Sequence, residues 1–171
     1  MSELSGDWGR LERILNPQRL AAGVKQAADK VGNYGSSEVK KGVVSGAPGG
    51  QKFVPNSSLT IARKGSSKPL IDKGDLVGSI TYQVIDANSV FVGVKKGSEA
   101  NIAAVHEFGC TIRVTPKMRA YLHYQGVHLK ASTQYIVIPP RPFLRPVLHG
   151  EEFRAGVAEI YIQAIERMFH A

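Results

Sequence analysis

The sequence predicts a single α+β domain in which a small, mostly antiparallel sheet is packed by an N-terminal and a C-terminal helix. Two patterns lead to this fold class: apolar residues recur at helical spacing near both ends and alternate at strand spacing in the middle. The length of 171 residues is typical of one domain, so we treat residues 1–171 as a unit. A hydrophobic content of 43% fits a globular protein.

Two helices are expected in the N-terminal part of the chain. Asp7 can cap a short helix, and Asn16 followed by Pro17 predicts the cap and first position of a second one. Gly32 and Gly35 are expected to weaken the second helix near its end. Its apolar positions recur at helical spacing and resume after these glycines: Leu20, Val24, Ala27, Ala28, Val31, Val39 and Val43.

Helical periodicity disappears over residues 44–74. This segment is rich in glycine, proline and serine and contains many basic residues, so the sequence predicts a long basic loop. Long loops inside compact domains are often functional, although a flexible linker has the same composition.

Strand patterns follow the loop. Apolar and polar residues alternate over 80–84 and again over 90–94, and the turn residues 86–88 between them predict a hairpin with one buried face. Further strands are expected around 112–114 and over 135–138, the last ended by a proline pair.

Three more helical segments are indicated in the second half of the chain. Ser98 can cap a helix with Ile102, Val105 and His106, which Gly109 ends. Residues 116–124 predict either a short helix or an excursion of the chain. The final helix has the clearest pattern, with acidic residues near its start and the apolar stripe Phe153, Val157, Ile160, Ala164, Ile165 and Met168.

The formal charge of +8 is concentrated in two segments. Residues 40–73 contain seven basic residues and one acid, and residues 111–149 contain six basic residues and no acid. Such clustering favours an acidic partner, either DNA or an acidic protein face. An ordinary solvated surface is the open alternative. The candidate contact residues are Lys40, Lys41, Lys52, Arg63, Lys64, Lys68, Lys73, Arg113, Lys117, Arg119 and Lys130.

No feature of the sequence predicts catalysis, a cofactor or a metal site. His106-Glu107-Phe108-Gly109-Cys110 begins like the zinc-binding His-Glu-x-x-His pattern, but a cysteine stands where the second histidine is needed. Residues 46–52 resemble a phosphate-binding loop but lack its Gly-Lys-Ser/Thr ending. Catalysis by Cys110 with His106 would need an orienting group and an oxyanion site, so both residues are expected to be structural. The single cysteine suggests a reducing, cytosolic compartment, and no apolar run is long enough to cross a membrane.

Four segments, in order, resemble one family. They are residues 53–65, residues 68–80, the run Ala103-Ala104-Val105-His106-Glu107-Phe108-Gly109, and the run Ile138-Pro139-Pro140-Arg141-Pro142-Phe143-Leu144-Arg145-Pro146. Together they resemble the virion-morphogenesis or tail-completion proteins of long-tailed bacteriophages, over roughly residues 10–168. The family-like positions are expected to have scaffold roles: Gly74, Leu76, His106, Phe108, Gly109, Pro140, Arg141, Pro142 and Phe143.

The resemblance implies a structural virion protein that is assembled in the bacterial host cytoplasm. Its expected role is a ring of subunits, six by family resemblance, that ends tail-tube growth and joins the head. The implied partners are further copies of the chain, the tail tube protein, neck or connector proteins and, non-specifically, genomic DNA in the channel. The alternatives are a neck or head–tail adaptor ring and, from another class, a stand-alone DNA-binding protein. The last would need a recognition element, and the sequence shows neither a helix-turn-helix nor a zinc finger.

Overall fold

The computed structural model describes residues 9, 12 and 15–170. The short helix expected at Asp7 lies almost entirely outside these residues. The elements in chain order are α2 (Pro17–Ser45), the 3-10 turn η1 (Pro48–Gly50), α3 (Ser58–Lys64), α4 (Asp75–Ser79), β1 (Ile80–Asp86), β2 (Ser89–Val94), α5 (Ser98–Phe108), β3 (Cys110–Arg113), α6 (Pro116–Tyr124), β4 (Tyr135–Ile138), α7 (Arg145–Leu148) and α8 (Glu151–His170).

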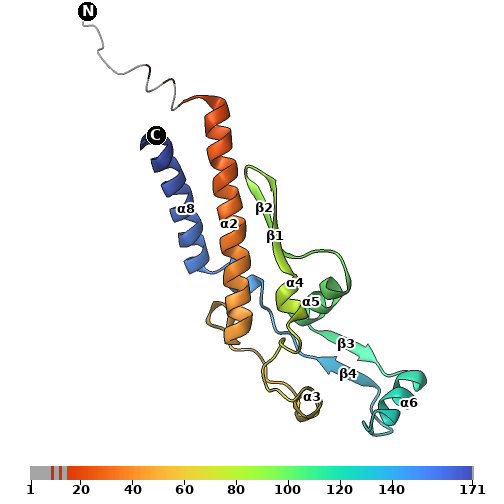
Figure 1. The fold of residues 1–171 in the computed structure, drawn as a ribbon. Coiled ribbons are helices and arrows are strands. Elements are labelled where there is room, and N and C mark those ends of the chain that lie inside the picture. Colours follow the sequence, from red (N-terminus) through yellow and green to blue (C-terminus); the bar gives the residue numbers. More distant parts are fainter. Residues whose placement is uncertain (1–8, 10–11, 13–14, 171) are drawn as a thin grey trace, which may run out of the picture.

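Helix α2 runs along the long axis of the molecule (Figure 1). It begins as predicted, because the Asn16 side-chain oxygen accepts hydrogen bonds from the N–H groups of Gln18 and Arg19 at 3.0 and 3.2 Å. It ends at Gly46, which has a left-handed conformation and donates its N–H to the Gly42 carbonyl.

The helix continues through Gly32 and Gly35 to Ser45, so its predicted resumption through Val39 and Val43 is confirmed and the glycines do not interrupt it. Both glycines are buried, and the ring of Tyr82 lies where a Cβ of Gly32 would stand. The missing side chain therefore lets the β1–β2 hairpin approach the helix closely, and this packing outweighs the low helix propensity of glycine.

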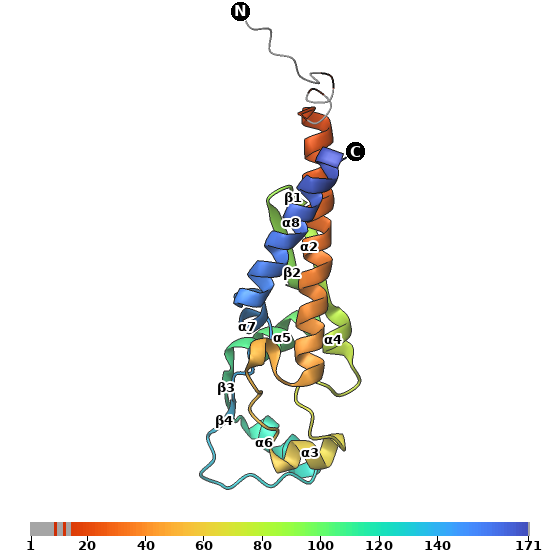
Figure 2. The ribbon, with the colours of Figure 1, turned by 90° about the vertical axis from the view of Figure 1, so that its left-hand side faces the viewer.

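The hairpin forms as predicted, with β1 and β2 antiparallel and Ile80 opposite Val94. Asp86 stabilises the turn by accepting a hydrogen bond from the N–H of Asn88 at 2.8 Å. Helix α8 packs along α2, where the rings of Phe153 and Tyr34 stack with centroids 5.5 Å apart (Figure 2). The predicted stripe of α8 is half-buried except at Ile165, which is exposed.

The α+β fold class is confirmed, but the strands form two separate antiparallel ribbons, β1–β2 and β3–β4. Ser98 does not cap α5; it is the first helical residue and Gly97 precedes it without a side-chain cap. Residues 116–124 form a helix, capped by Thr115. The segment 44–74 is not a loop throughout, because α2 extends to Ser45, η1 follows, and Ser57 caps α3 by accepting a hydrogen bond from the N–H of Thr60.

The hydrophobic core lies beneath the C-terminal half of α2. Its buried members come from α2, the segment after η1, α4, β1, α5 and the chain around α7: Val39, Val43, Phe53, Leu76, Ile80, Ala103, Phe143 and Val147. Gly74, with φ of +94°, precedes α4 and not the strand directly. Among the described residues, no helix is both long enough and apolar enough to span a lipid bilayer.

Candidate functional site

Segments from both basic tracts lie at the end of the molecule that is opposite the C-terminus of α8 (Figures 1 and 2). We call residues 54–69 and 110–138, which include α3, β3, α6 and β4, the distal arm, and the remaining described residues the body. The two segments are joined by a hydrogen bond of 3.2 Å from Nη2 of Arg63 to Oε1 of Gln125. Residues that are about 60 positions apart in the sequence therefore form one surface.

The distal arm contains seven of the eleven predicted contact residues: Arg63, Lys64, Lys68, Arg113, Lys117, Arg119 and Lys130. It contains none of the 14 acidic residues of the chain, which leaves 15 basic and 14 acidic residues elsewhere. Nearly all of the net charge of +8 is thus in the arm. The other four candidates lie apart: Lys40 and Lys41 are on α2, and Lys52 and Lys73 lie on segments that lead into and out of the first part of the arm.

Three of the seven arm residues have internal roles, namely Arg63, which bonds Gln125 as described above, Arg119 and Lys64. Arg119 donates from Nη1 to the Lys130 carbonyl at 2.9 Å and from Nη2 to the Thr133 carbonyl at 2.6 Å, so it holds the loop after α6 in place. Lys64 donates to the Lys68 carbonyl. By contrast, Arg113, Lys117 and Lys130 are exposed, and none has an ion-pair partner among the described residues.

The arm also exposes large apolar side chains. Val127 is its only buried hydrophobic residue among those described. Seven others are exposed, with Tyr124 at 85% and Val137 at 68% the most extreme: Val54, Leu59, Ile61, Tyr121, Tyr124, Tyr135 and Val137. Clusters of exposed apolar residues on a charged background are typical of surfaces that contact other proteins.

A buried carboxylate lies at the joint between body and arm. Glu107, in the last turn of α5, accepts hydrogen bonds from the N–H groups of Phe143, Leu144 and Arg145 at 2.8 to 3.1 Å. Nε of Arg145 donates to it as well, at 3.2 Å. The carboxylate therefore satisfies the free N–H groups at the start of α7 and fixes the chain that follows β4.

Arg141 connects the arm to the body at a second point. Its side chain is buried, with Nε donating to the Val54 carbonyl at 2.7 Å and Nη2 donating to the Pro55 carbonyl at 2.9 Å. Its own N–H donates to the His106 carbonyl at 2.6 Å. The first, third and fourth family-like segments thus meet at this joint, although they are far apart in the sequence.

The remaining family-like residues occupy defined places around the joint. Phe143 is completely buried in the core, while Phe108 is exposed and lies beneath the Arg145 guanidinium, 4.7 Å from the ring centroid. Gly109, with φ of +76°, ends α5 beside Pro140. Pro142 is half-buried between Arg141 and Phe143.

His106 is half-buried, and its Nδ1 atom is buried without a hydrogen-bond partner among the described residues. Burial, followed by the charges of Arg141 and Lys64, lowers the pKa of His106 below its usual value. Cys110 is the first residue of β3 and lies outside the helix that contains His106, so the two do not share one helix face. No group of three potential metal-ligating side chains occurs among the described residues.

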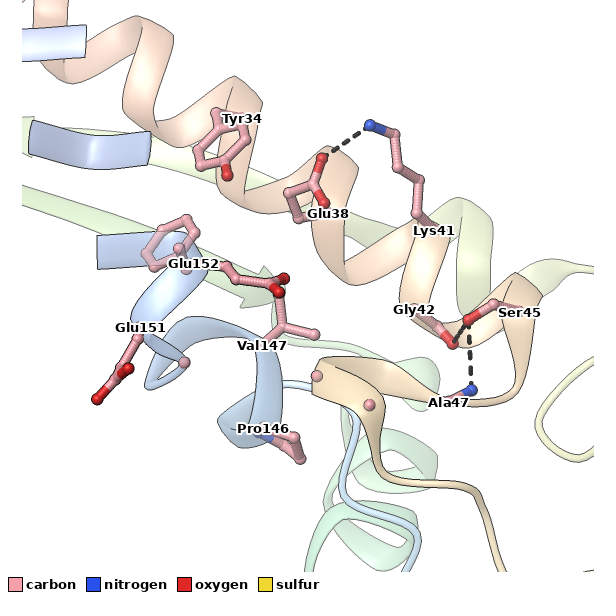
Figure 3. A pocket seen from close by; sticks show the side chains of 14 residues that line it. Tyr34, Glu38, Lys41, Gly42, Ser45, Ala47, Pro146, Val147, Glu151 and Glu152 are labelled. Atoms are coloured by element: carbon pink, nitrogen blue, oxygen red, sulfur yellow. Dashed lines mark hydrogen bonds and ion pairs between the residues drawn. The ribbon is translucent and has the colours of Figure 1, made fainter. Parts of the chain in front are cut away.

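A groove in the body was not predicted from the sequence. It has a volume of about 660 Å³ and lies between the C-terminal half of α2, η1 and the start of α8 (Figure 3). Its charged lining residues are Glu38, Lys41, Glu151 and Glu152, and Lys41 already pairs with Glu38 at 2.7 Å. In Figure 3 Glu152 extends toward the space between the two helices, while the Glu151 side chain points away from it.

Glu107 is the important residue whose role was not predicted from the sequence, although it stands in both the broken zinc motif and the third family-like segment. A signal was present: an acidic residue in the last turn of a helix is unfavourable beside the negative end of the helix dipole. A lone acid there needs a specific donor set, which the N–H groups of residues 143–145 provide.

A comparison with known proteins identifies the family of the chain. The model of the phage virion morphogenesis family matches residues 7–166. No curated protein and no solved structure gives a significant match to the chain.

Proposed function

The chain belongs to the phage virion morphogenesis family, and from this premise we propose that it is a tail-completion subunit at the head-proximal end of the tail. In this role the subunits form a ring that ends tail-tube growth and presents a surface to the neck. The observation that supports the proposal is the family match, which spans all four segments, three of which meet at the joint. Proteins of such families are typically structural and not enzymatic.

The two-part architecture suits this role. The body has its own core and nearly balanced charge, whereas the distal arm exposes basic and apolar side chains that only another molecule can cover. A protein that works by assembly needs such a surface.

Electron microscopy of particles produced without this protein tests the role. Abnormally long tails would support the ending of tube growth by this subunit. Tails of normal length that stay separate from heads would instead assign it to a neck or adaptor ring. Normal, joined and infectious particles would contradict both forms of the proposal.

A second experiment asks what the arm contacts. Replacing Lys64, Lys68, Arg113 and Lys117 together by glutamine removes four arm cations while leaving Arg119 to hold its loop. We expect heads and tails to remain unjoined, because exposed aromatic and aliphatic side chains accompany these cations. The matched control replaces four exposed body cations by glutamine: Lys95, Lys96, Arg154 and Arg167.

Two other outcomes would change this account of the arm. If particles join normally but genome retention or ejection is altered, the arm cations face DNA phosphates in the channel, as sequence-independent contacts of that kind require. If neither joining nor DNA retention changes, the cations are ordinary solvated surface.

A further inference from the structure

One face of the distal arm is left uncovered by the described residues of its own chain. A two-stranded ribbon is marginally stable in water unless a helix or further strands cover it. In β3–β4, Arg113 is opposite Tyr135 and Thr111 is opposite Val137, and all four side chains are exposed on one face. This face is therefore unpartnered and combines a cation, an aromatic ring and an aliphatic side chain.

The composition of the arm defines the chemistry of its partner. Seven basic residues without an acid require negative charge opposite them. The exposed apolar residues, which include Tyr124 and Val137, require a surface that can exclude water from them. The phosphate backbone of a DNA duplex provides the first but not the second, whereas an acidic protein groove provides both.

The groove of the body provides this combination. Its lining includes the stacked rings of Tyr34 and Phe153 together with three carboxylates and one ammonium group. Glu38 pairs with Lys41, and among the described residues Glu151 and Glu152 have no ion-pair partner. The groove thus presents two unpaired negative charges beside an aromatic wall.

We propose that the distal arm of one subunit docks in the groove between α2 and α8 of a second copy of the chain. The contact is head-to-tail, because the arm and the groove are different surfaces of one molecule (Figures 2 and 3). Each subunit that gives its arm still has an open groove, so the contact repeats and closes if the rotation between subunits divides a circle. This inference rests on the ring role proposed above and names the surfaces that would form the ring.

Charge reversal tests the contact in the purified full-length protein. The groove variant has Glu151→Lys and Glu152→Lys, and the arm variant has Arg113→Glu and Lys117→Glu. In sedimentation velocity each variant should associate with itself at least about tenfold more weakly than the wild type, because like charges then face each other. Control variants with Glu166→Lys on α8, or with Lys95→Glu, reverse exposed charges outside both surfaces and should associate normally.

Mixing the two variants keeps the test independent of folding defects. The native arm of the groove variant fits the native groove of the arm variant, and the acids introduced in the arm variant can pair with the lysines introduced in the groove variant. An equimolar mixture should therefore recover association, with the variants alternating. Glu151→Gln with Glu152→Gln should weaken association more mildly while adding no positive charge to the start of α8.

Three outcomes would overturn the inference. They are wild-type association by both variants at low salt, failure of the folded variants to associate when mixed, and a wild-type protein that stays monomeric at every concentration tested. None of them decides the role in morphogenesis, which is judged from particles made without the protein.

Discussion

The body and the distal arm differ in how much apolar surface they bury and in how their charges are balanced. The body buries Val39, Ile80 and Phe143 almost completely and has nearly equal numbers of basic and acidic residues. The arm buries little beyond Val127, exposes seven large apolar side chains and has no acid. The body can therefore fold around its own core, whereas the arm is held mainly by its joint to the body. Four substitutions can break or sharpen this comparison.

Substitution of Glu107 should have the largest effect, because this carboxylate connects α5 to the start of α7. Glu107→Gln leaves one acceptor oxygen and turns an NH₂ group toward backbone donors at a buried position. We expect the free energy of unfolding to fall by about 2–4 kcal/mol, because buried N–H groups that lose their acceptor cost about 1–3 kcal/mol each. Urea denaturation followed by circular dichroism measures this change.

The control for that experiment is Glu166→Gln, which alters an exposed carboxylate on α8 and should change stability by less than about 0.5 kcal/mol. Equal, small effects of the two substitutions would mean that the joint does not depend on the Glu107 carboxylate.

Arg141→Lys should loosen the arm more than the body. Lysine cannot donate to the carbonyls of Val54 and Pro55 with the geometry of the guanidinium, and hydrogen bonds of charged groups contribute about 1.5–3 kcal/mol each. Amide exchange should therefore accelerate in residues 54–69 and remain slow in α2. Arg154→Lys on α8 is the control, and acceleration spread evenly over the whole chain would contradict a local role for Arg141.

Gly32→Ala tests whether tertiary packing, rather than helix propensity, determines which residue is favoured at position 32 of α2. Helix propensity alone would favour alanine by about 0.5–1 kcal/mol. Because the Tyr82 ring occupies the space of the added methyl group, we expect a net loss of about 1–3 kcal/mol instead. Gly78→Ala in α4 meets no neighbouring atom and should be neutral or stabilising. A stabilising effect of Gly32→Ala in thermal unfolding would show that the hairpin does not pack against α2 in this way.

Substitution of His106 should have the smallest effect, and this effect should appear in the pH dependence of the free energy of unfolding. Burial and the nearby charges of Arg141 and Lys64 lower its pKa in the folded state, so the unfolded chain binds a proton more readily. Stability should be unaffected above the unfolded pKa of about 6.5 and should fall as the pH is lowered below it. His106→Gln should flatten this part of the profile in urea titrations at several pH values. An unchanged profile would mean that other groups dominate it.

The sequence allowed the elements of the body to be predicted because local signals determine them. The Asn16 cap, the alternation in the hairpin and the glycine that ends α5 each act within a few residues. The continuity of α2 could not be predicted, because it depends on the Tyr82 ring, which is 50 residues away from Gly32 in the chain.

The candidate site was predictable only in part for the same reason. Clustering of charge along the sequence identified the seven basic arm residues, but their meeting depends on contacts such as Arg63 with Gln125. The joint through Glu107 and Arg141 and the groove at Glu151 are tertiary features with no local periodicity. The order of the family-like segments indicated that they act together, but not that they are in contact.

The central claim is that the arm, and not the body, is the part completed by assembly. Hydrogen exchange measured on the free subunit and on assembled particles tests it most directly, since ordering exposed segments costs about 1–2 kcal/mol per residue without a partner. We expect residues 54–69 and 110–138 to exchange faster in the free subunit than in the particle, while α2 up to Val43 stays protected in both. Equally strong protection of the arm before and after assembly would contradict the account.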